Sequence, residues 1–302
     1  MGGGAASVFP VHACAYSRAL AERSPGFAMQ VFDPPDGDGD GAADAFPEDP
    51  YGELEERSGC PGLTQRFPDR VLVMTARGCF MNCRHCTRRW LLSKSEIVDT
   101  PQRLAACVEY VKARPLVRDV LLSGGDILTL DDARVAAFVD AFASLAQIDI
   151  VRLCTRAVCT NPARVTESLA RTLGASGKVW VNTQFNCADE VTPQARRAAD
   201  VLSREGIPMS CQSVLLKGVN DTPEKMLALL RALSAARIRP YYVFMCDPVK
   251  GTERFRVPLG KALEIERFCA ENIGGLALPR FVADLPGSKR KMPISELAAA
   301  GR

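Results

Sequence analysis

The sequence predicts an α/β fold, a partial (β/α)6-type TIM barrel preceded by an irregular N-terminal extension. From residue 70 onward, short apolar segments alternate with helical patterns at intervals of about 30 residues, as in successive βα units. The apolar segments contain few polar residues, which is typical of parallel strands buried on both faces. The 302 residues suffice for one large domain of this kind. In such a barrel the active site lies at the carboxyl ends of the strands, so we look for functional residues there.

Seven strands and six helices follow from these patterns. Strands are expected at 71–75, 119–123, 150–154, 179–183, 208–216, 241–245 and 279–284. Helices are expected at 101–113, 131–145, 161–173, 192–206, 222–236 and 259–272. We divide the chain into a flexible or partly helical extension, 1–48, and a barrel with its C-terminal segment, 49–302. Residues 33–50 are rich in Asp, Gly and Pro, which predicts a flexible acidic loop.

Composition narrows the class of protein. Hydrophobic residues make up 47% and charged residues 24%, which is ordinary for a soluble domain. The net charge of +3 and the lack of basic runs longer than residues 289–291 predict no nucleic-acid partner. No segment has the ~18 consecutive apolar residues of a membrane span, and no signal peptide is evident, so we expect a cytoplasmic protein without membrane association. Most of the 12 cysteines stand singly in apolar segments, for example Cys107 and Cys269, and are expected to be small buried hydrophobes in a reducing compartment.

Three cysteines cluster directly after the first strand. Cys79, Cys83 and Cys86 lie within eight residues in GCFMNCRHC. Three thiolates leave one iron of a four-iron cluster without a protein ligand, and that iron can bind the amino and carboxylate groups of S-adenosylmethionine (SAM). The spacing therefore predicts a radical SAM enzyme with a [4Fe–4S] cluster. Zinc is the alternative, but the sequence offers no evident fourth ligand, since the other histidine is the distant His12.

A glycine-rich motif follows the second strand. Ser123, Gly124, Gly125 and Asp126 place two glycines at a strand end, where the backbone can approach a ligand closely. Taken alone, this motif is an ordinary turn. Together with the cysteines it predicts the site that holds the amino group of SAM.

From about Asp49 to Pro293 the chain resembles the lysine 2,3-aminomutase family, which uses SAM and pyridoxal phosphate (PLP). The resemblance keeps the order and near-constant spacing of eight segments. They are PGLTQRFPDRVL (61–72), CRHCTRRW (83–90), LLSGGD (121–126), RLCTRAV (152–158), VWVNTQFN (179–186), QSVLLKGVND (212–221), IRPYYVFMCD (238–247) and DLPGSKRKMP (284–293).

The resemblance implies a PLP site. Lys291 corresponds to the lysine that forms the Schiff base, and Arg66 and Arg70 correspond to arginines that face the PLP phosphate. A lysine reacts as the neutral amine, and the adjacent Lys289 and Arg290 are expected to favour that form through their positive charge. Lys289 is also an alternative Schiff-base residue.

The resemblance also implies sites for SAM and substrate. His85 and Gln212 correspond to residues beside SAM, and Arg88 to the arginine that binds the substrate carboxylate. Asp247 and Asp284 correspond to two aspartates that bind the distal ammonium of lysine. Two carboxylates at one end of a pocket favour a cationic side chain over a glutamate, although a single aspartate after a strand is more often a turn or helix cap.

The implied activity is a 2,3-aminomutase that moves the α-amino group of a cationic amino acid to its β-carbon, with L-lysine to β-lysine as the first choice. An arginine 2,3-aminomutase of a specialised-metabolite pathway and a β-lysine-forming enzyme linked to a translation factor remain open. From a different class, a non-catalytic iron–sulfur protein is opposed by the glycine motif, Lys291 and the two aspartates. The implied partners are a small amino acid and an electron donor such as flavodoxin or ferredoxin.

The chain departs from the family pattern in several places. Residues 288–290 replace a glycine run before the lysine, and Phe67 and Phe244 stand where tyrosine is common. Thr222 stands where family members have a zinc-binding cysteine. We therefore expect any homo-oligomer to form without the zinc-bearing C-terminal extension of longer members.

Overall fold

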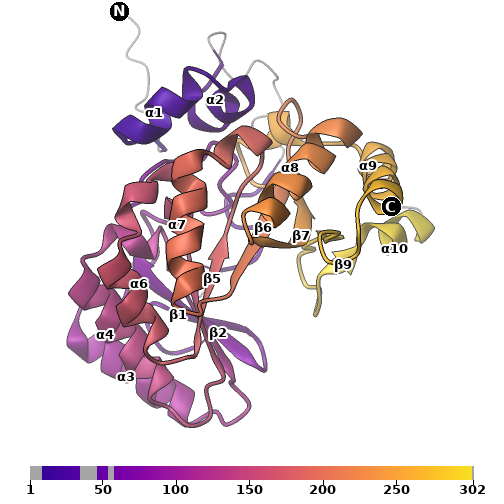
Figure 1. Ribbon diagram of the computed structural model, residues 1–302. Helices are drawn as coiled ribbons and strands as arrows, with labels where there is room; N and C mark the ends of the chain where they lie inside the picture. The colour runs from indigo at the N-terminus through magenta and orange to yellow at the C-terminus, as the bar shows by residue number, and fades with distance from the viewer. Residues whose placement is uncertain (1–8, 35–45, 54–57, 301–302) are drawn as a thin grey trace, which may run out of the picture.

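The computed structural model describes residues 9–34, 46–53 and 58–300. Most of the acidic loop predicted at 33–50 lies outside these ranges. The described chain forms one curved sheet with helices along its outer face (Figure 1).

Nine strands form the sheet in sequence order. Strands β2 to β8 pair in parallel, and β1 and β9 join in antiparallel orientation at the two edges. Among the described residues β1 and β9 are not paired with each other, so the barrel is open and the predicted partial barrel is confirmed. The strands are β1 (Leu63–Phe67), β2 (Arg70–Ala76), β3 (Asp119–Gly124), β4 (Ile150–Cys154), β5 (Val179–Thr183), β6 (Met209–Leu215), β7 (Arg239–Met245), β8 (Arg280–Ala283) and β9 (Met292–Pro293).

The two faces of the parallel strands have different partners. Val73, Leu122, Leu153 and Val181 face one another across β2 to β5 in register and are buried in the main core. Because side chains alternate along a strand, their neighbours, such as Leu121 and Cys154, line the interior of the barrel instead. The apolar face thus packs against the helices, and the other face is free to build a site.

The helices begin with recurring local signals. Thr100, Thr192 and Thr222 each accept a hydrogen bond from a first-turn backbone amide, and a proline follows each of them. The α-helices are α1 (Ala15–Ala21), α2 (Pro25–Val31), α3 (Pro101–Lys112), α4 (Asp132–Ala143), α5 (Ala157–Thr160), α6 (Glu167–Gly174), α7 (Pro193–Arg204), α8 (Pro223–Ala235), α9 (Leu259–Asn272) and α10 (Ile294–Ala299). Short 3-10 helices are η1 (Ile127–Thr129), η2 (Pro162–Arg164), η3 (Ala188–Glu190) and η4 (Glu253–Phe255).

Most predicted elements are confirmed. The strands expected at 150–154 and 179–183 and the helix expected at 259–272 have those bounds in the structure. The single helix expected at 161–173 is wrong, because η2 ends before Thr166, whose hydroxyl caps a new helix by accepting from the amide of Leu169. The edge strands β1 and β9 were not predicted.

Helices α1 and α2 of the N-terminal extension lie at one end of the sheet (Figure 1). Leu20, Phe27 and Val31 are buried there in a second apolar cluster. That cluster includes Met81 and Leu216 of the barrel. Residues 9–34 therefore pack as part of the same body as the barrel.

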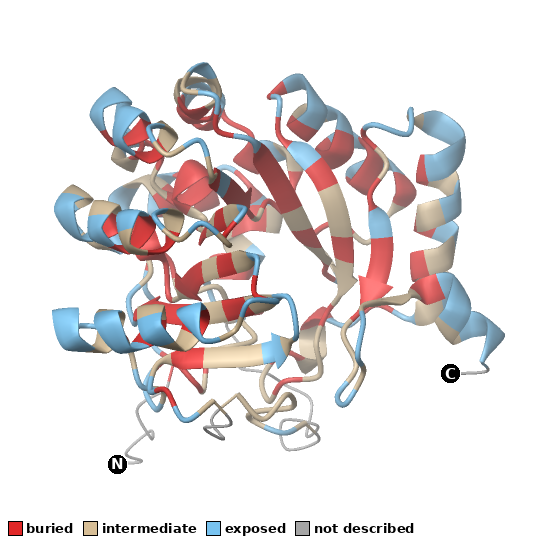
Figure 2. Cartoon of the chain, turned by 90° about the horizontal axis from the view of Figure 1, so that it is seen from below, coloured by how far each residue is buried: buried red, intermediate tan, exposed pale blue. Residues whose placement is uncertain are grey.

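The burial of side chains follows the arrangement of the helices around the sheet. Figure 2 shows buried residues along the strands and on the inner sides of the helices, with exposed residues on the outer sides. Among the helices in the described part of the chain, none is long and apolar enough to cross a membrane.

Candidate active site

A cavity of about 580 Å³ occupies the interior of the barrel. Every predicted site residue lines it, except Lys289, the alternative Schiff-base lysine. The predicted residues that line it are Arg66, Arg70, Cys79, Cys83, His85, Cys86, Arg88, Ser123, Gly124, Gly125, Asp126, Gln212, Asp247, Asp284 and Lys291. The fold thus brings together residues that are spread over more than two hundred positions.

The three clustered cysteines lie in the loop that follows β2. They are half-buried and form no disulfide, and burial raises the pKa of Cys86 to about 11 and that of Cys79 well above its usual value. Among the described residues, no group of three His, Cys, Asp or Glu side chains is arranged to hold a single metal ion. The thiols instead border a cavity with room for a larger group, and binding iron there requires them to lose their protons.

The two glycines of the SGGD motif allow β3 to touch the start of the cysteine loop. A Cβ on Gly125 would lie 2.4 Å from the carbonyl oxygen of Gly78, and one on Gly124 would lie 2.9 Å from that of Ala76. Gly124 also has a φ of +104°, which side chains disfavour. The motif therefore fixes the distance between the glycine turn and the cysteines.

The carboxylate of Asp126 has a structural task. It accepts hydrogen bonds from the Thr155 hydroxyl (2.6 Å), the Leu128 amide (3.0 Å) and the Arg156 amide (2.9 Å). Burial raises its pKa, while these hydrogen bonds act in the opposite direction. The side chain ties the end of β3 to the end of β4, so a ligand at this motif would meet the backbone of residues 123–125 more readily than this carboxylate.

His85 presents an unpartnered buried nitrogen. Its Nε2 lies 3.1 Å from the side-chain amide of Gln184 and 3.2 Å from that of Asn186, which assigns the ring proton to Nδ1. Burial, followed by the charge of Arg156, holds the pKa of His85 well below its usual value, so the ring is neutral. Nδ1 has no hydrogen-bond partner among the described residues, which leaves one donor beside the cysteine loop for a ligand.

The residues predicted to hold PLP surround the ring of Phe67. The guanidinium carbon of Arg70 lies 4.0 Å from the ring centroid, that of Arg66 lies 5.4 Å away, and Lys291 Nζ lies 5.9 Å away. Lys291 Nζ is also 5.4 Å from the ring of Phe244. The two phenylalanines that depart from the family pattern are therefore next to the predicted Schiff-base lysine.

The neighbours of Lys291 differ from the prediction. Lys289 is exposed, and the exposed Arg290 pairs with Glu296, so neither surrounds Lys291 with positive charge. Lys291 Nζ is instead bonded to the carboxylate of Asp284. The expectation that Lys289 and Arg290 supply a cationic environment is wrong, because both side chains lie exposed on the turn at residues 286–290. Of the two lysines, Lys291 is the one that lines the cavity.

Asp284 also binds Arg66. Two hydrogen bonds, of 2.9 and 3.0 Å, join the Arg66 guanidinium to both carboxylate oxygens. Arg66 further donates to the carbonyl oxygens of Leu285 and Ser288. One predicted substrate-binding residue is thus paired with both Arg66 and Lys291.

Asp247 and Arg88 are each paired with the described segment 46–53. The Tyr51 hydroxyl donates to Asp247 at 2.7 Å, and Arg88 makes two hydrogen bonds of 2.9 Å to the carboxylate of Glu53. Burial raises the pKa of Asp247 to about 6, Tyr51 opposes that rise, and Asp284 adds to it. Burial would lower the pKa of Arg88, but the Glu53 carboxylate outweighs it and raises that pKa.

Residues 73–230, just over half of the chain, match the Radical SAM superfamily. A putative L-lysine 2,3-aminomutase of Treponema pallidum is 36% identical over 83% of this chain and 70% of its own length. The chain belongs to the lysine 2,3-aminomutase family of radical SAM proteins.

Other members of the lysine 2,3-aminomutase family agree with this. An L-lysine 2,3-aminomutase of Fusobacterium nucleatum is 40% identical over 83% of this chain, and a glutamate 2,3-aminomutase of Clostridioides difficile is 33% identical over 82%. The chain spans 59% of the first protein's length and 58% of the second's. The crystal structure of Streptococcus suis SuiB bound to precursor peptide SuiA has the same fold, with a TM-score of 0.55 and 15% identity over 72% of this chain and 49% of that one.

Membership implies a [4Fe–4S] cluster, SAM and PLP. The chemistry of the cavity fits these groups: three sulfurs and an unpartnered imidazole nitrogen lie at the cysteine loop, and two arginines and a lysine lie around Phe67. Cysteine thiolates are the usual ligands of iron–sulfur clusters, and guanidinium groups suit a phosphate.

Among the side chains of this cavity that sequence reasoning missed are Tyr51, Glu53 and Arg156. Arg156 follows β4 by two residues, so the rule that function lies after strand ends would have found it. That rule did not lead to Arg66, Arg70 or Gln212. Arg66 and Arg70 belong to the β1–β2 hairpin and Gln212 to the middle of β6.

Proposed function

We propose that this chain is a radical SAM- and PLP-dependent 2,3-aminomutase that moves the α-amino group of a cationic amino acid, first of all L-lysine, to the β-carbon. The relatives named as L-lysine 2,3-aminomutases support the reaction. The pairing of charged groups in the cavity supports the class of substrate.

The observation that carries the proposal is that Arg88 and Asp284, which both line the cavity, already bind groups of the kind expected on the substrate. Arg88 binds a carboxylate, that of Glu53, through two parallel hydrogen bonds, which is the geometry it would offer to an amino-acid carboxylate. Asp284 binds an ammonium, that of Lys291. The Glu53 carboxylate and the Lys291 ammonium thus occupy the positions proposed for the carboxylate and the distal ammonium of lysine.

The two aspartates would then select the side chain of the substrate. With a pKa of about 6, Asp247 is ionised near neutral pH, and Asp284 is close enough to raise that pKa. A distal ammonium or guanidinium relieves this repulsion, whereas a distal carboxylate would increase it. This favours lysine or arginine over glutamate.

When bound, the cluster and SAM supply a carbon radical that removes hydrogen, and PLP supplies a carbonyl that forms imines with amines. The chain's own residues would orient the bound groups and neutralise their negative charges. Arg66 and Arg70 would bind the phosphate, and Arg88 would hold the substrate carboxylate. Because Asp284 is paired with Arg66 and Lys291, it becomes available to a substrate only when these two pairs open.

The test is an anaerobic assay of the chain with SAM, PLP and a reductant against lysine, arginine, ornithine and glutamate, with products identified by mass and chromatography. We expect β-lysine as the main product. β-Arginine would support the arginine 2,3-aminomutase alternative, and turnover of glutamate in preference to both would contradict the substrate assignment. A matched Asp284→Asn variant should raise the KM for lysine strongly, because it removes one of the two charges.

Further parts of the proposal concern partners and organisation. We infer a low-potential electron donor such as flavodoxin or ferredoxin, a cytoplasmic location, and a barrel spanning residues 49–302 with the extension 1–48 before it.

A further inference from the structure

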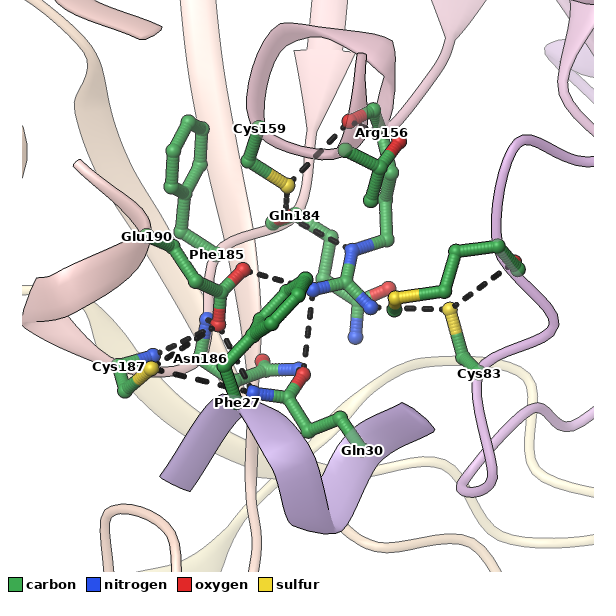
Figure 3. Close-up of polar contacts among 12 residues, drawn as sticks. Phe27, Gln30, Cys83, Arg156, Cys159, Gln184, Phe185, Asn186, Cys187 and Glu190 are labelled. Atoms are coloured by element: carbon green, nitrogen blue, oxygen red, sulfur yellow. Dashed lines mark hydrogen bonds and ion pairs between the residues drawn. The ribbon is translucent and has the colours of Figure 1, made fainter. Parts of the chain in front are cut away.

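Arg156 is a buried arginine that contacts a cysteine of the cluster loop. It lies between β4 and α5, directly before the helix, and its side chain is only 10% exposed. One guanidinium nitrogen donates a hydrogen bond of 2.9 Å to the sulfur of Cys83 (Figure 3). None of the roles assigned above to PLP or substrate uses this side chain.

Its other donors fix the guanidinium in place. Nε donates to the carbonyl oxygen of Gln184 (3.1 Å), and the second terminal nitrogen donates to Glu190 (2.7 Å) and Gln30 (3.1 Å). Glu190 has no exposed side-chain surface. A planar group bonded on three sides cannot turn away from Cys83 without breaking several buried hydrogen bonds, which makes the contact a fixed feature of the site.

Glu190 is itself held firmly. Its other oxygen accepts hydrogen bonds from the amides of Asn186 and Cys187 and from the side chain of Gln30, each at 2.9 Å. Figure 3 shows these groups converging on one side of Arg156, with Cys83 on the other. The positive charge therefore lies between a buried carboxylate and a cluster sulfur.

The N-terminal extension completes this arrangement. Gln30 belongs to α2, so the extension reaches Arg156 directly. The extension also encloses the cysteine loop with backbone and side-chain bonds. They are the Ala13–Met81 bridge and the bonds Cys14 N to Phe80 O, Asn82 N to His12 O, Arg84 N to Gln30 O, and Arg84 Nε to Asp33.

A hydrogen bond to a ligand sulfur affects an iron–sulfur cluster in a defined direction. Reduction adds negative charge to the cluster and its thiolates, and a cation that donates to a thiolate stabilises the reduced form more than the oxidised one. Because Arg156 is buried, solvent ions screen this interaction weakly. Glu190 acts in the opposite direction from the far side of the guanidinium.

We propose that Arg156 is a positioning residue that raises the reduction potential of the cluster through its hydrogen bond to Cys83, and that Glu190 and Gln30 hold it there. The step concerned is the uptake of one electron by the cluster, and no bond forms or breaks in the protein. The inference rests on the cluster part of the proposed function and is independent of PLP and the amino-acid substrate.

The test is a potentiometric titration of the anaerobically reconstituted chain without SAM, with dithionite as reductant and the reduced cluster followed by electron paramagnetic resonance. In Arg156→Gln we expect the equilibrium for reduction to fall at least tenfold, which is about 59 mV for a one-electron couple. Arg156→Lys keeps the positive charge but lacks the several donors of the guanidinium, so its reduction potential should lie between those of Arg156→Gln and the parent. Glu190→Gln keeps a side-chain oxygen that can accept the hydrogen bond from Arg156 but removes the opposing negative charge, so it should shift the potential in the opposite direction.

Arg164→Gln is the matched control. Arg164 is also a largely buried arginine of the segment after β4, but it bonds to the carbonyls of Leu128 and Leu130 and to Asp132, and not to a cysteine. Its removal should leave the potential unchanged. Equal potentials in the parent and Arg156→Gln, at equal iron content, would overturn the proposal.

If Arg156→Gln fails to bind iron, the Glu190→Gln variant decides. An unchanged or lower potential there overturns the proposal, and a higher one supports it. Inactivity on lysine with these shifts present would count against the proposed function alone.

Discussion

The pair formed by Arg88 and Glu53 yields a prediction about substrate affinity. If Arg88 receives the substrate carboxylate, the substrate must first displace Glu53, whose two hydrogen bonds of 2.9 Å occupy the same donors. The Glu53→Gln substitution removes the competing charge while keeping the size of the side chain. The affinity for substrate should then rise by the free energy of the pair that no longer has to be broken.

The magnitude follows from the geometry and burial of the pair. The two side chains are 19% and 25% exposed, so their interaction is stronger than that of a surface pair, which contributes ~0.2–1 kcal/mol, and at the low end of charged hydrogen bonds, which contribute ~1.5–3 kcal/mol. About 1.4 kcal/mol corresponds to a tenfold change in affinity. We expect the KM for lysine to fall about tenfold with little change in kcat.

The assay is steady-state β-lysine formation under anaerobic conditions. Glu48→Gln is the control, because Glu48 lies in the same segment but pairs with the exposed Lys94, so the KM should not change. A KM that stays constant or rises in Glu53→Gln would refute the reasoning. It would mean that Glu53 belongs to the working site instead of competing with the substrate.

Three further predictions concern charge, packing and the reactive lysine. The kcat/KM for lysine should fall as the pH drops through about 6, because protonation of Asp247 removes a negative charge that attracts the substrate ammonium; this limb of the pH profile should vanish in Asp247→Asn. Gly125→Ala should destabilise the chain by about 2 kcal/mol in urea unfolding and lower its iron content, because the new Cβ would lie 2.4 Å from the Gly78 carbonyl oxygen. Borohydride reduction of the PLP-loaded chain, followed by peptide mass analysis, should label Lys291, which lines the cavity. Labelling of the exposed Lys289 instead would contradict the assignment of Lys291 as the Schiff-base residue.

The sequence predicted the barrel well because its strands are strongly apolar. Residues 150–154 and 179–183 are buried on the face toward the helices, so their apolar character marks their bounds. The edge strands escaped prediction for the opposite reason. β9 has two residues, and β1 contains Thr64, Gln65 and Arg66, so neither shows an apolar run.

Part of the lining of the cavity was also predicted, but the pairs of charged side chains within it were not. The cysteines and the glycine motif are local signals that keep their meaning in any fold. The contacts of Arg88 with Glu53 and of Asp284 with Arg66 join residues that are 35 and 218 positions apart in the sequence. Hydrophobic periodicity does not predict such polar pairs. Asp126 shows the same limit: its motif is recognisable, but only the fold reveals that its carboxylate ties β3 to β4.

The unpaired edges of the open barrel have a consequence for how the wall of the site is held together. In the described chain, the wall between β1 and β9 is completed by Arg66, which bonds to Asp284, Leu285 and Ser288. Backbone hydrogen bonds between strands persist through most substitutions, whereas a contact made by a side chain such as that of Arg66 is lost when that residue is replaced. A substitution at Arg66 would therefore loosen the contact between β1 and the segment that follows β8, while the seven parallel strands keep their register.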